Sequence, residues 1–239
     1  MARKAARKSA RKPAPTASSR KPAGPTTERD KIVAAFLDLL ADKPFESIGF
    51  TDVAGHAGMS LAQLRAEFPS TLAIVAAHIK ATDRALLAED LSEMAEEPAR
   101  ERLFDILMRR LELLAPHREA VRSLLRSARR NPPLALALYA LAVRSQQWML
   151  TAAGIGASGP RGMIRAQGLA ILFSQVLRTW VHDDDPGQAP TMAALDRALA
   201  RGQRFAGLLD DLYSLPVHTW RLRSRRRRRG RDREESAAI

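Results

Sequence analysis

The chain of 239 residues contains no cysteine. This absence excludes disulfide bonds, catalysis by a thiolate and zinc sites with cysteine ligands, and it is typical of a reducing compartment. Long hydrophobic runs are also missing, because charged residues interrupt every apolar stretch before the roughly 18 to 20 residues that a bilayer-spanning helix needs. The sequence therefore predicts a protein without a transmembrane segment, and we expect it in the cytoplasm.

Acidic residues are scarce only at the two ends of the chain. The formal net charge is +13; residues 1–27 hold eight Lys or Arg and no acid, and residues 220–239 hold nine Arg and three acids. The middle, residues 28–219, is nearly balanced, with 22 bases and 23 acids. Any attraction to nucleic acid or anionic membrane therefore belongs mainly to the tails. We predict that these basic tails, residues 1–27 and 215–239, are disordered.

Apolar residues recur at three- and four-residue steps through the middle of the chain, for example at Ile32, Phe36 and Leu39. This spacing lines one face of a helix, and no stretch alternates like a β-strand. Proline, glycine and capping residues divide the pattern into predicted helices over residues 27–41, 50–57, 60–67, 70–95, 99–115, 117–130, 133–152, 160–182 and 190–214. The predicted fold class is all-α, with about nine helices.

The segment FTDVAGHAGMSLAQLRAEF, residues 50–68, predicts two short helices joined by a tight turn. Gly58 can adopt the positive φ that a sharp turn requires. Ser60 and Gln63 form the pattern of a capping box, which places the start of the second helix at Ser60. Small and apolar residues at helical spacing let the two helices cross over a shared core. They are Val53, Ala54, Ala57, Leu64 and Phe68. This segment is therefore a predicted helix-turn-helix.

At these residues the sequence resembles the TetR (TetR/AcrR) family of transcriptional regulators. The motifs that carry the resemblance are Asp52-Val53-Ala54, Ala57-Gly58-Met59-Ser60 and Phe68-Pro69-Ser70. The resemblance implies a three-helix DNA-binding head at residues 28–80 and a helical body at residues 81–214 that binds a small apolar ligand and forms a homodimer. It also implies which residues face DNA: Ser60, Leu61, Gln63, Arg65, Glu67 and Thr71.

Several of these positions depart from the family pattern. Members usually carry Lys or Arg directly after the serine, an aromatic residue where Arg65 stands and Lys where Thr71 stands. Residues 28–80 hold five bases and seven acids, so the head has little general attraction for phosphate. Gln63 and Arg65 can still read adenine and guanine edges in a major groove. Two interpretations stay open: a head that binds a specific DNA sequence, and a degenerate head kept for packing.

The C-terminal half is similar to the TetR-like lipid-binding proteins of coenzyme Q (ubiquinone) biosynthesis. The similarity is carried by Arg102-Leu103-Phe104-Asp105, Met108-Arg109-Arg110, Pro116-His117, and a helix ending in Trp180 before Asp183-Asp184-Asp185-Pro186. It implies an apolar cavity for an isoprenoid or lipid and a head that no longer binds DNA. The alternative function is therefore a lipid-binding accessory protein of ubiquinone biosynthesis whose tails contact anionic membrane.

Large apolar residues of the body are candidates for ligand contacts, because helical spacing is expected to turn them inward. These candidates are Phe104, Met108, Trp148, Phe173 and Trp180. Ordinary core packing is the alternative interpretation, and for any single one of these positions it is the more common reason for a large inward residue. The predicted helices 160–182 and 190–214 carry apolar faces around Ile171, Val176, Leu195, Phe205 and Leu209. Such faces often pair across a two-fold axis, so we predict a homodimer through these helices.

Two further motifs are interpreted as loops. Residues 154–159, GIGASG, match the dinucleotide-binding string but lack the preceding strand that this motif needs. His182 and the aspartates at 183–185 precede Pro-Gly, a pattern typical of an exposed loop and a helix cap rather than a metal site. No Ser, His and acid are grouped in the sequence. We therefore expect no enzymatic activity, no catalytic residues, no cofactor and no metal.

Overall fold

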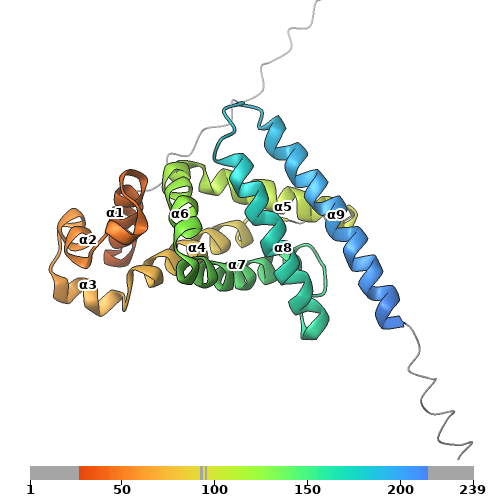
Figure 1. The fold of residues 1–239 in the computed structure, drawn as a ribbon, viewed down its shortest axis with the longest axis horizontal. Helices are drawn as coiled ribbons and strands as arrows, with labels where there is room; N and C mark the ends of the chain where they lie inside the picture. The colour runs from red at the N-terminus through yellow and green to blue at the C-terminus, as the bar shows by residue number, and fades with distance from the viewer. Residues whose placement is uncertain (1–26, 92–93, 95, 215–239) are drawn as a thin grey trace, which may run out of the picture.

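The computed structural model describes residues 27–91, 94 and 96–214, and for residues 205–214 it describes only the helical backbone. All regular structure in this part of the chain is helical (Figure 1). The α-helices are α1 (Glu28–Asp42), α2 (Phe50–Ala57), α3 (Leu61–Glu67), α4 (Thr71–Leu87), α5 (Ala99–Leu114), α6 (Arg118–Arg130), α7 (Pro132–Ala152), α8 (Gly159–Trp180) and α9 (Ala189–Ser214), and two short 3-10 helices are η1 (Phe45–Ser47) and η3 (Ala115–His117). The predicted all-α fold is confirmed. The predicted disordered tails fall almost entirely outside the described residues.

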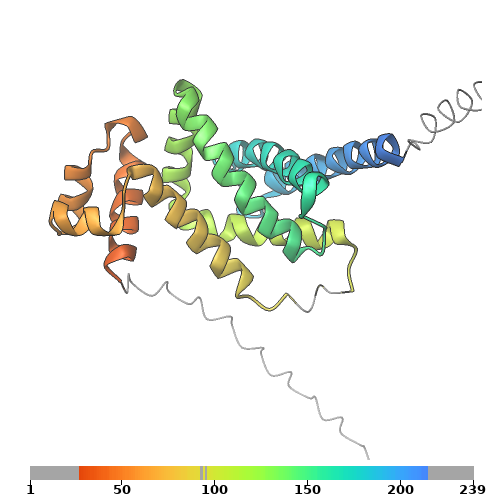
Figure 2. The ribbon, with the colours of Figure 1, turned by 90° about the horizontal axis from the view of Figure 1, so that it is seen from below.

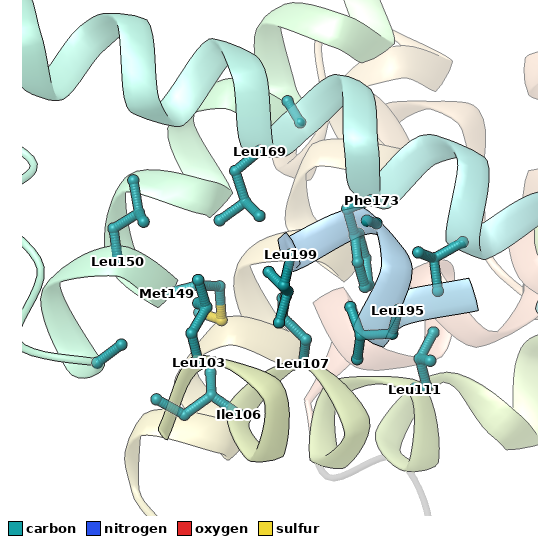
Figure 3. Packing of buried hydrophobic residues seen from close by; sticks show 14 of the residues in the cluster. Leu103, Ile106, Leu107, Leu111, Met149, Leu150, Leu169, Phe173, Leu195 and Leu199 are labelled. Atoms are coloured by element: carbon teal, nitrogen blue, oxygen red, sulfur yellow. The ribbon is translucent and has the colours of Figure 1, made fainter. Parts of the chain in front are cut away.

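The helices gather into a small head and a larger body (Figure 1). The head consists of α1, α2, α3 and the first half of α4 around a core that includes Phe36, Leu64 and Phe68. The body core is formed by α5, α7, α8 and α9, whose leucines and Phe173 point toward one another (Figure 3). None of the described helices is long and apolar enough to cross a membrane.

Helix α4 belongs to both units and joins them. Its residues Ile74 and Val75 are buried in the head core, whereas Leu86 is buried in the body core. Figure 2 shows α4 running from the head into the body as one continuous helix. Helix α4 is therefore a direct covalent and packing link between the two cores.

Side-chain caps explain why several of the helices begin where the sequence predicts. The side-chain oxygens of Thr27, Ser70 and Asn131 accept hydrogen bonds from backbone nitrogens three residues later, at 3.1, 3.1 and 3.0 Å. These bonds satisfy donors that have no partner inside the first helical turn. Every predicted helix start lies within one residue of the observed start, and for these three helices the local caps explain the agreement.

The prediction is wrong at the end of the fourth helix. The apolar periodicity predicts a helix over residues 70–95, whereas α4 ends at Leu87. Glu89 and Asp90 follow, and their negative charges oppose the partial negative charge of a helix C-terminus. Ending the helix here also lets the chain turn, so that Met94 is buried against the body core.

Gly162, in the first turn of α8, allows the preceding loop to cross the helix closely. A Cβ atom at this position would lie 2.1 Å from the carbonyl carbon of Ala157. Gly162→Ala is therefore expected to lower the free energy of unfolding by about 1–3 kcal/mol, because the backbone must shift.

At Gly168, on the same helix, a Cβ meets nothing within 4 Å. Gly168→Ala should instead stabilise by up to about 1 kcal/mol through helix propensity. Urea unfolding of both variants tests this, and equal stability would contradict it.

Candidate functional site

Helices α2 and α3 form the predicted helix-turn-helix. Gly58 ends α2 in the left-handed conformation, with φ 68° and ψ 36°. The backbone nitrogen of Met59 then donates to the carbonyl of Ala54 at 3.0 Å, which closes the turn. Val53, Leu64 and Phe68 are buried beneath the two helices and fix their crossing. The glycine turn predicted from the sequence is confirmed.

The capping box at the start of α3 is also confirmed. The Oγ of Ser60 accepts from the backbone nitrogen of Gln63 at 3.2 Å, and the Oε1 of Gln63 accepts from the backbone nitrogen of Ser60 at 2.9 Å. A bidentate contact with adenine needs both the amide oxygen and the amide nitrogen. The oxygen is already used by the cap, so only the nitrogen is left to donate to a base.

The outer face of α3 is exposed and carries most of the residues predicted to face DNA. Ser60, Leu61, Gln63 and Arg65 are all exposed, Leu61 at 52%, and Leu61 and Arg65 lie one helical turn apart on the same side of α3. An exposed leucine beside an arginine gives the face one apolar group and one cation. Those two groups match a thymine methyl and a guanine edge in a major groove.

Glu67 is the last residue of α3 and Thr71 the first residue of α4, and both are less accessible. The Nη1 of Arg29 in α1 donates to the carbonyl of Glu67 at 3.0 Å and lies 3.5 Å from its carboxylate. The same guanidinium lies 4.2 Å from the ring centroid of Phe68. Arg29 therefore holds α3 against α1 and offsets part of the charge of Glu67. Thr71 is half-buried in the first turn of α4.

Helix α6 docks the head onto the body, a contact that the sequence does not predict. Ala120 of α6 is buried in the head core. The Oγ of Ser123 donates to the carbonyl of Lys43 at 2.9 Å, and the backbone nitrogen of Phe45 donates to the Oγ of Ser127 at 3.0 Å. The head is therefore held to the body by α6 as well as by α4.

Two histidines meet where α4 passes the start of α6. The rings of His78 and His117 lie 5.2 Å apart between centroids and are nearly perpendicular. Burial, with smaller contributions from the neighbouring His117 and Arg110, lowers the pKa of His78 to about 4. Burial also lowers the pKa of His117, against the opposing effect of Asp38 in the head. Both rings are therefore neutral at pH 7 at the boundary between head and body.

A buried ion pair joins three helices inside the body. Arg110 of α5 pairs with Asp83 of α4, and their side chains are only 6% and 10% exposed. The Oγ of Ser145 in α7 donates to the Oδ1 of the same aspartate at 2.9 Å. Polar groups at this depth are costly unless they are paired, so this contact fixes how α4 lies on the body.

Of the residues predicted to contact a ligand, four belong to the body core or its edge. Phe173 and Trp180 are buried in the core, and Phe104 and Met108 are half-buried against it. Trp148 is 59% exposed, so the prediction that it faces inward is wrong. Packing turns Gln146, Met149 and Leu150 of α7 inward, and position 148 then lies on the opposite side of the helix, toward solvent. Whether the four inward residues contact a ligand stays a prediction.

The structure places a cleft elsewhere in the body, at the start of α5 and between α8 and α9. Its volume is about 530 Å³, and none of the predicted ligand residues lines it. Leu103, Leu150, Leu169 and Leu199 form part of its wall, together with four arginines. The sequence signal for this cleft is weak, because basic residues between apolar ones on α8 also describe an ordinary exposed helix.

The apolar faces predicted for dimer formation divide into buried and exposed residues. Val176 and Leu195 are buried in the core of their own chain, so the prediction that they pair with a second copy is wrong. Their helices pack against each other inside one protomer and already cover them. Ile171 is 50% exposed. The side chains of Phe205 and Leu209 lie outside the described residues. Other exposed apolar residues on these helices are Met163, Ile164 and Met192.

The two motifs interpreted as loops are loops in the structure. Residues 154–158 lie between α7 and α8, Gly154 has φ 72°, and Gly159 is already the first residue of α8. The Oδ2 of Asp183 accepts from the backbone nitrogen of Thr191 at 2.9 Å, and hydrogen bonds from Thr191 hold the pKa of Asp183 low. The Oδ2 of Asp185 accepts from the backbone nitrogen of Ala189 at 3.0 Å, in the first turn of α9. These carboxylates order the loop and the helix start, as predicted.

Comparison with known proteins identifies the fold. No protein-family model matches the chain, and no curated protein matches its sequence. Solved structures do match. A TetR transcriptional regulator from Nitrosomonas europaea is 22% identical, with a TM-score of 0.58 over 74% of this chain and 98% of that one. A TetR transcriptional regulator from Rhodococcus sp. RHA1 is 19% identical, with a TM-score of 0.52 over 73% of this chain and 95% of that one. The chain therefore has the TetR-like fold predicted from its head motif.

Proposed function

We propose that this chain is a TetR-type transcriptional regulator that binds DNA as a homodimer. The observation that supports this proposal best is the exposed outer face of α3 on a rigid helix-turn-helix. Gly58 and the Ser60–Gln63 capping box fix the start of α3, and buried Leu64 and Phe68 fix its direction. Two such helices, one from each protomer, enter successive major grooves roughly 34–36 Å apart.

Base contacts by α3 and phosphate contacts by the tails have different roles in this proposal. Leu61 and Arg65 on the outer face of α3 provide sequence readout. The general attraction to phosphate comes from residues 1–27 and 220–239, which carry eight and nine basic residues. Removing both tails should therefore flatten the salt dependence of DNA binding while leaving the preferred sequence unchanged.

The proposed dimer forms through exposed residues of α8 and α9. Ile164, Ile171 and Met192 are apolar and exposed on these helices, which is unfavourable in a lone protomer. A ligand in the body then regulates DNA binding by shifting the distance between the two heads. Helices α4 and α6 provide the connection, because each contributes buried residues to the head core. Sedimentation at micromolar concentration should give the mass of two chains.

Selection of DNA from a random pool by the full-length protein, near physiological salt, tests the proposed function. Enrichment of a two-fold symmetric sequence is the expected result, and recovery of no preferred sequence would overturn the proposal. Arg65→Ala should then weaken binding to the selected site by about 1–3 kcal/mol and relax its preference at one base pair in each half-site. Arg144→Ala, an exposed arginine on α7, is the control and should bind like the wild type.

The alternative is a lipid-binding accessory protein of ubiquinone biosynthesis. It is favoured by the modest charge of α3, where Arg65 is the one basic residue and Glu67 is held by Arg29. Mass spectrometry of lipids retained by the purified protein discriminates between the two functions. An isoprenoid lipid at one copy per chain, together with no enrichment of DNA, would favour the accessory protein.

A further inference from the structure

Arg29, the second residue of α1, reaches across the head to the end of α3. It lies on the same side of α1 as the buried residues Ile32 and Phe36, which turns it toward α3. Its Nη1 donates to the backbone carbonyl of Glu67 at 3.0 Å and lies 3.5 Å from the Oε2 of the same residue. The guanidinium carbon lies 4.2 Å from the ring centroid of Phe68. Three contacts with the end of α3 therefore hold one guanidinium in place.

The other side of this guanidinium is open to a further partner. The side chain of Arg29 is 50% exposed. Its Nη1 makes both polar contacts with Glu67, and no residue in the described part of the chain hydrogen-bonds to Nε or Nη2. A guanidinium carries five N–H donors in a planar fork, and that fork matches the oxygens of a phosphate. The side chain is therefore fixed at one edge and accessible at the other.

Glu67 without a neighbouring cation is unfavourable beside DNA. It occupies a position predicted to face DNA, and its side chain is 35% exposed. A carboxylate close to a phosphate weakens binding, because like charges repel. Arg65 is the one basic residue of α3, and among the described residues Glu67 forms its ion pair with Arg29 instead. Arg29 is therefore the cation that offsets the charge of Glu67.

From this arrangement we infer that Arg29 binds a DNA phosphate at the end of α3, and that Glu67 is a positioning residue that acts through it. Glu67 and Phe68 hold the guanidinium, and its open edge donates to a phosphate oxygen. The inference rests on the proposed function, because it adds a backbone contact to the base contacts of Leu61 and Arg65. Such a contact fixes the register of α3 on the duplex and carries no sequence information.

A purely structural role for the pair of Arg29 and Glu67 is the alternative. An exposed ion pair contributes little to stability, because water and salt screen it. The two roles differ in the salt dependence of DNA binding. A cation that contacts a phosphate releases counterions from the duplex, whereas a contact inside the protein releases none. The slope of log affinity against log salt concentration therefore separates them.

Fluorescence anisotropy of the full-length protein with its selected DNA site, at a series of salt concentrations, tests the inference. Arg29→Gln keeps an apolar stem and an amide donor but has no charge. It should weaken binding about tenfold or more and make the slope shallower by about two, one for each protomer. Arg29→Lys keeps the charge and should keep the slope. Arg84→Gln, an exposed arginine near the body end of α4, is the matched control and should change neither quantity.

Glu67→Gln tests whether the carboxylate acts through Arg29. In the wild-type background it should weaken binding, because the guanidinium loses one of its anchors. In the Arg29→Gln background it should strengthen binding, because it removes an uncompensated carboxylate beside the DNA. This reversal of sign is not expected from a side chain that contributes only to packing. Should Arg29→Gln fail to fold, the double variant replaces it, and its slope should be shallower than that of Glu67→Gln alone.

Three outcomes would overturn the inference. They are an unchanged slope in Arg29→Gln, an equal change in Arg84→Gln, and weaker binding on Glu67→Gln in both backgrounds. A wild-type protein that selects no DNA sequence would overturn the proposed function together with this inference. A wild type that selects a sequence, with an Arg29→Gln variant of the same slope, would overturn the inference alone.

Discussion

Asp83→Ala is expected to lower the free energy of unfolding by about 3–5 kcal/mol, because it leaves the charge of Arg110 buried without its partner. The two side chains are 10% and 6% exposed, so water cannot replace the lost carboxylate. The Nε of Arg110 has no partner among the described residues, and its Nη1 pairs with Asp83. The variant therefore loses the main compensation for a buried cation. Urea unfolding followed by circular dichroism measures the effect.

The matched control removes both charges together. Asp83→Leu/Arg110→Met leaves no buried ion, and its stability should return to within about 1 kcal/mol of the wild type or exceed it. The hydroxyl of Ser145 loses its acceptor in this variant and can turn to the backbone carbonyl one helical turn earlier. Equal stability of Asp83→Ala and the wild type would contradict the proposed cost. A double variant as unstable as Asp83→Ala would show that the loss comes from packing rather than from charge.

The helix-turn-helix could be predicted from the sequence because its determinants are local. Gly58 supplies its own positive φ, and the capping box joins Ser60 to a residue only three positions later. Each of these contacts joins residues that are only a few positions apart, so the contact can be predicted from the sequence alone. The docking of head on body is different. It depends on Phe45 and Ser127, which are 82 residues apart and carry no distinguishing pattern.

The ligand site could not be located from the sequence, because it too depends on contacts between residues far apart in the chain. Size and hydrophobicity select Phe173 and Trp180 as candidates, but those properties also select core residues, and both side chains are buried in the core. Periodicity misplaces Trp148, because its position on α7 relative to the buried residues is set by packing against neighbouring helices. The arginines of the cleft come from three helices far apart in the chain. Only the fold brings them together.

His78→Phe is expected to flatten the pH dependence of stability between about pH 6.5 and pH 4. Burial holds the pKa of His78 near 4 in the folded state, below its ordinary value of 6.5. As the pH falls through 6.5, the unfolded chain binds a proton that the folded chain does not, so the wild type loses stability. This loss amounts to about 3 kcal/mol by pH 4 and is absent at pH 7 and above. Phenylalanine keeps the ring packing and does not titrate.

Urea unfolding at a series of pH values from 7.5 to about 4 measures this difference, because linkage relates its slope to proton binding. Carboxylates, and His117 with its lowered pKa, contribute to acid sensitivity in both proteins, so the wild-type curve must be compared with the variant curve at each pH. His182→Gln, an exposed histidine in the loop before α9, is the control and should follow the wild type. Superimposable curves for His78→Phe and the wild type would show that the buried ring does not resist protonation. A steeper wild-type curve would establish that the junction of α4 with α6 is held together by a neutral histidine.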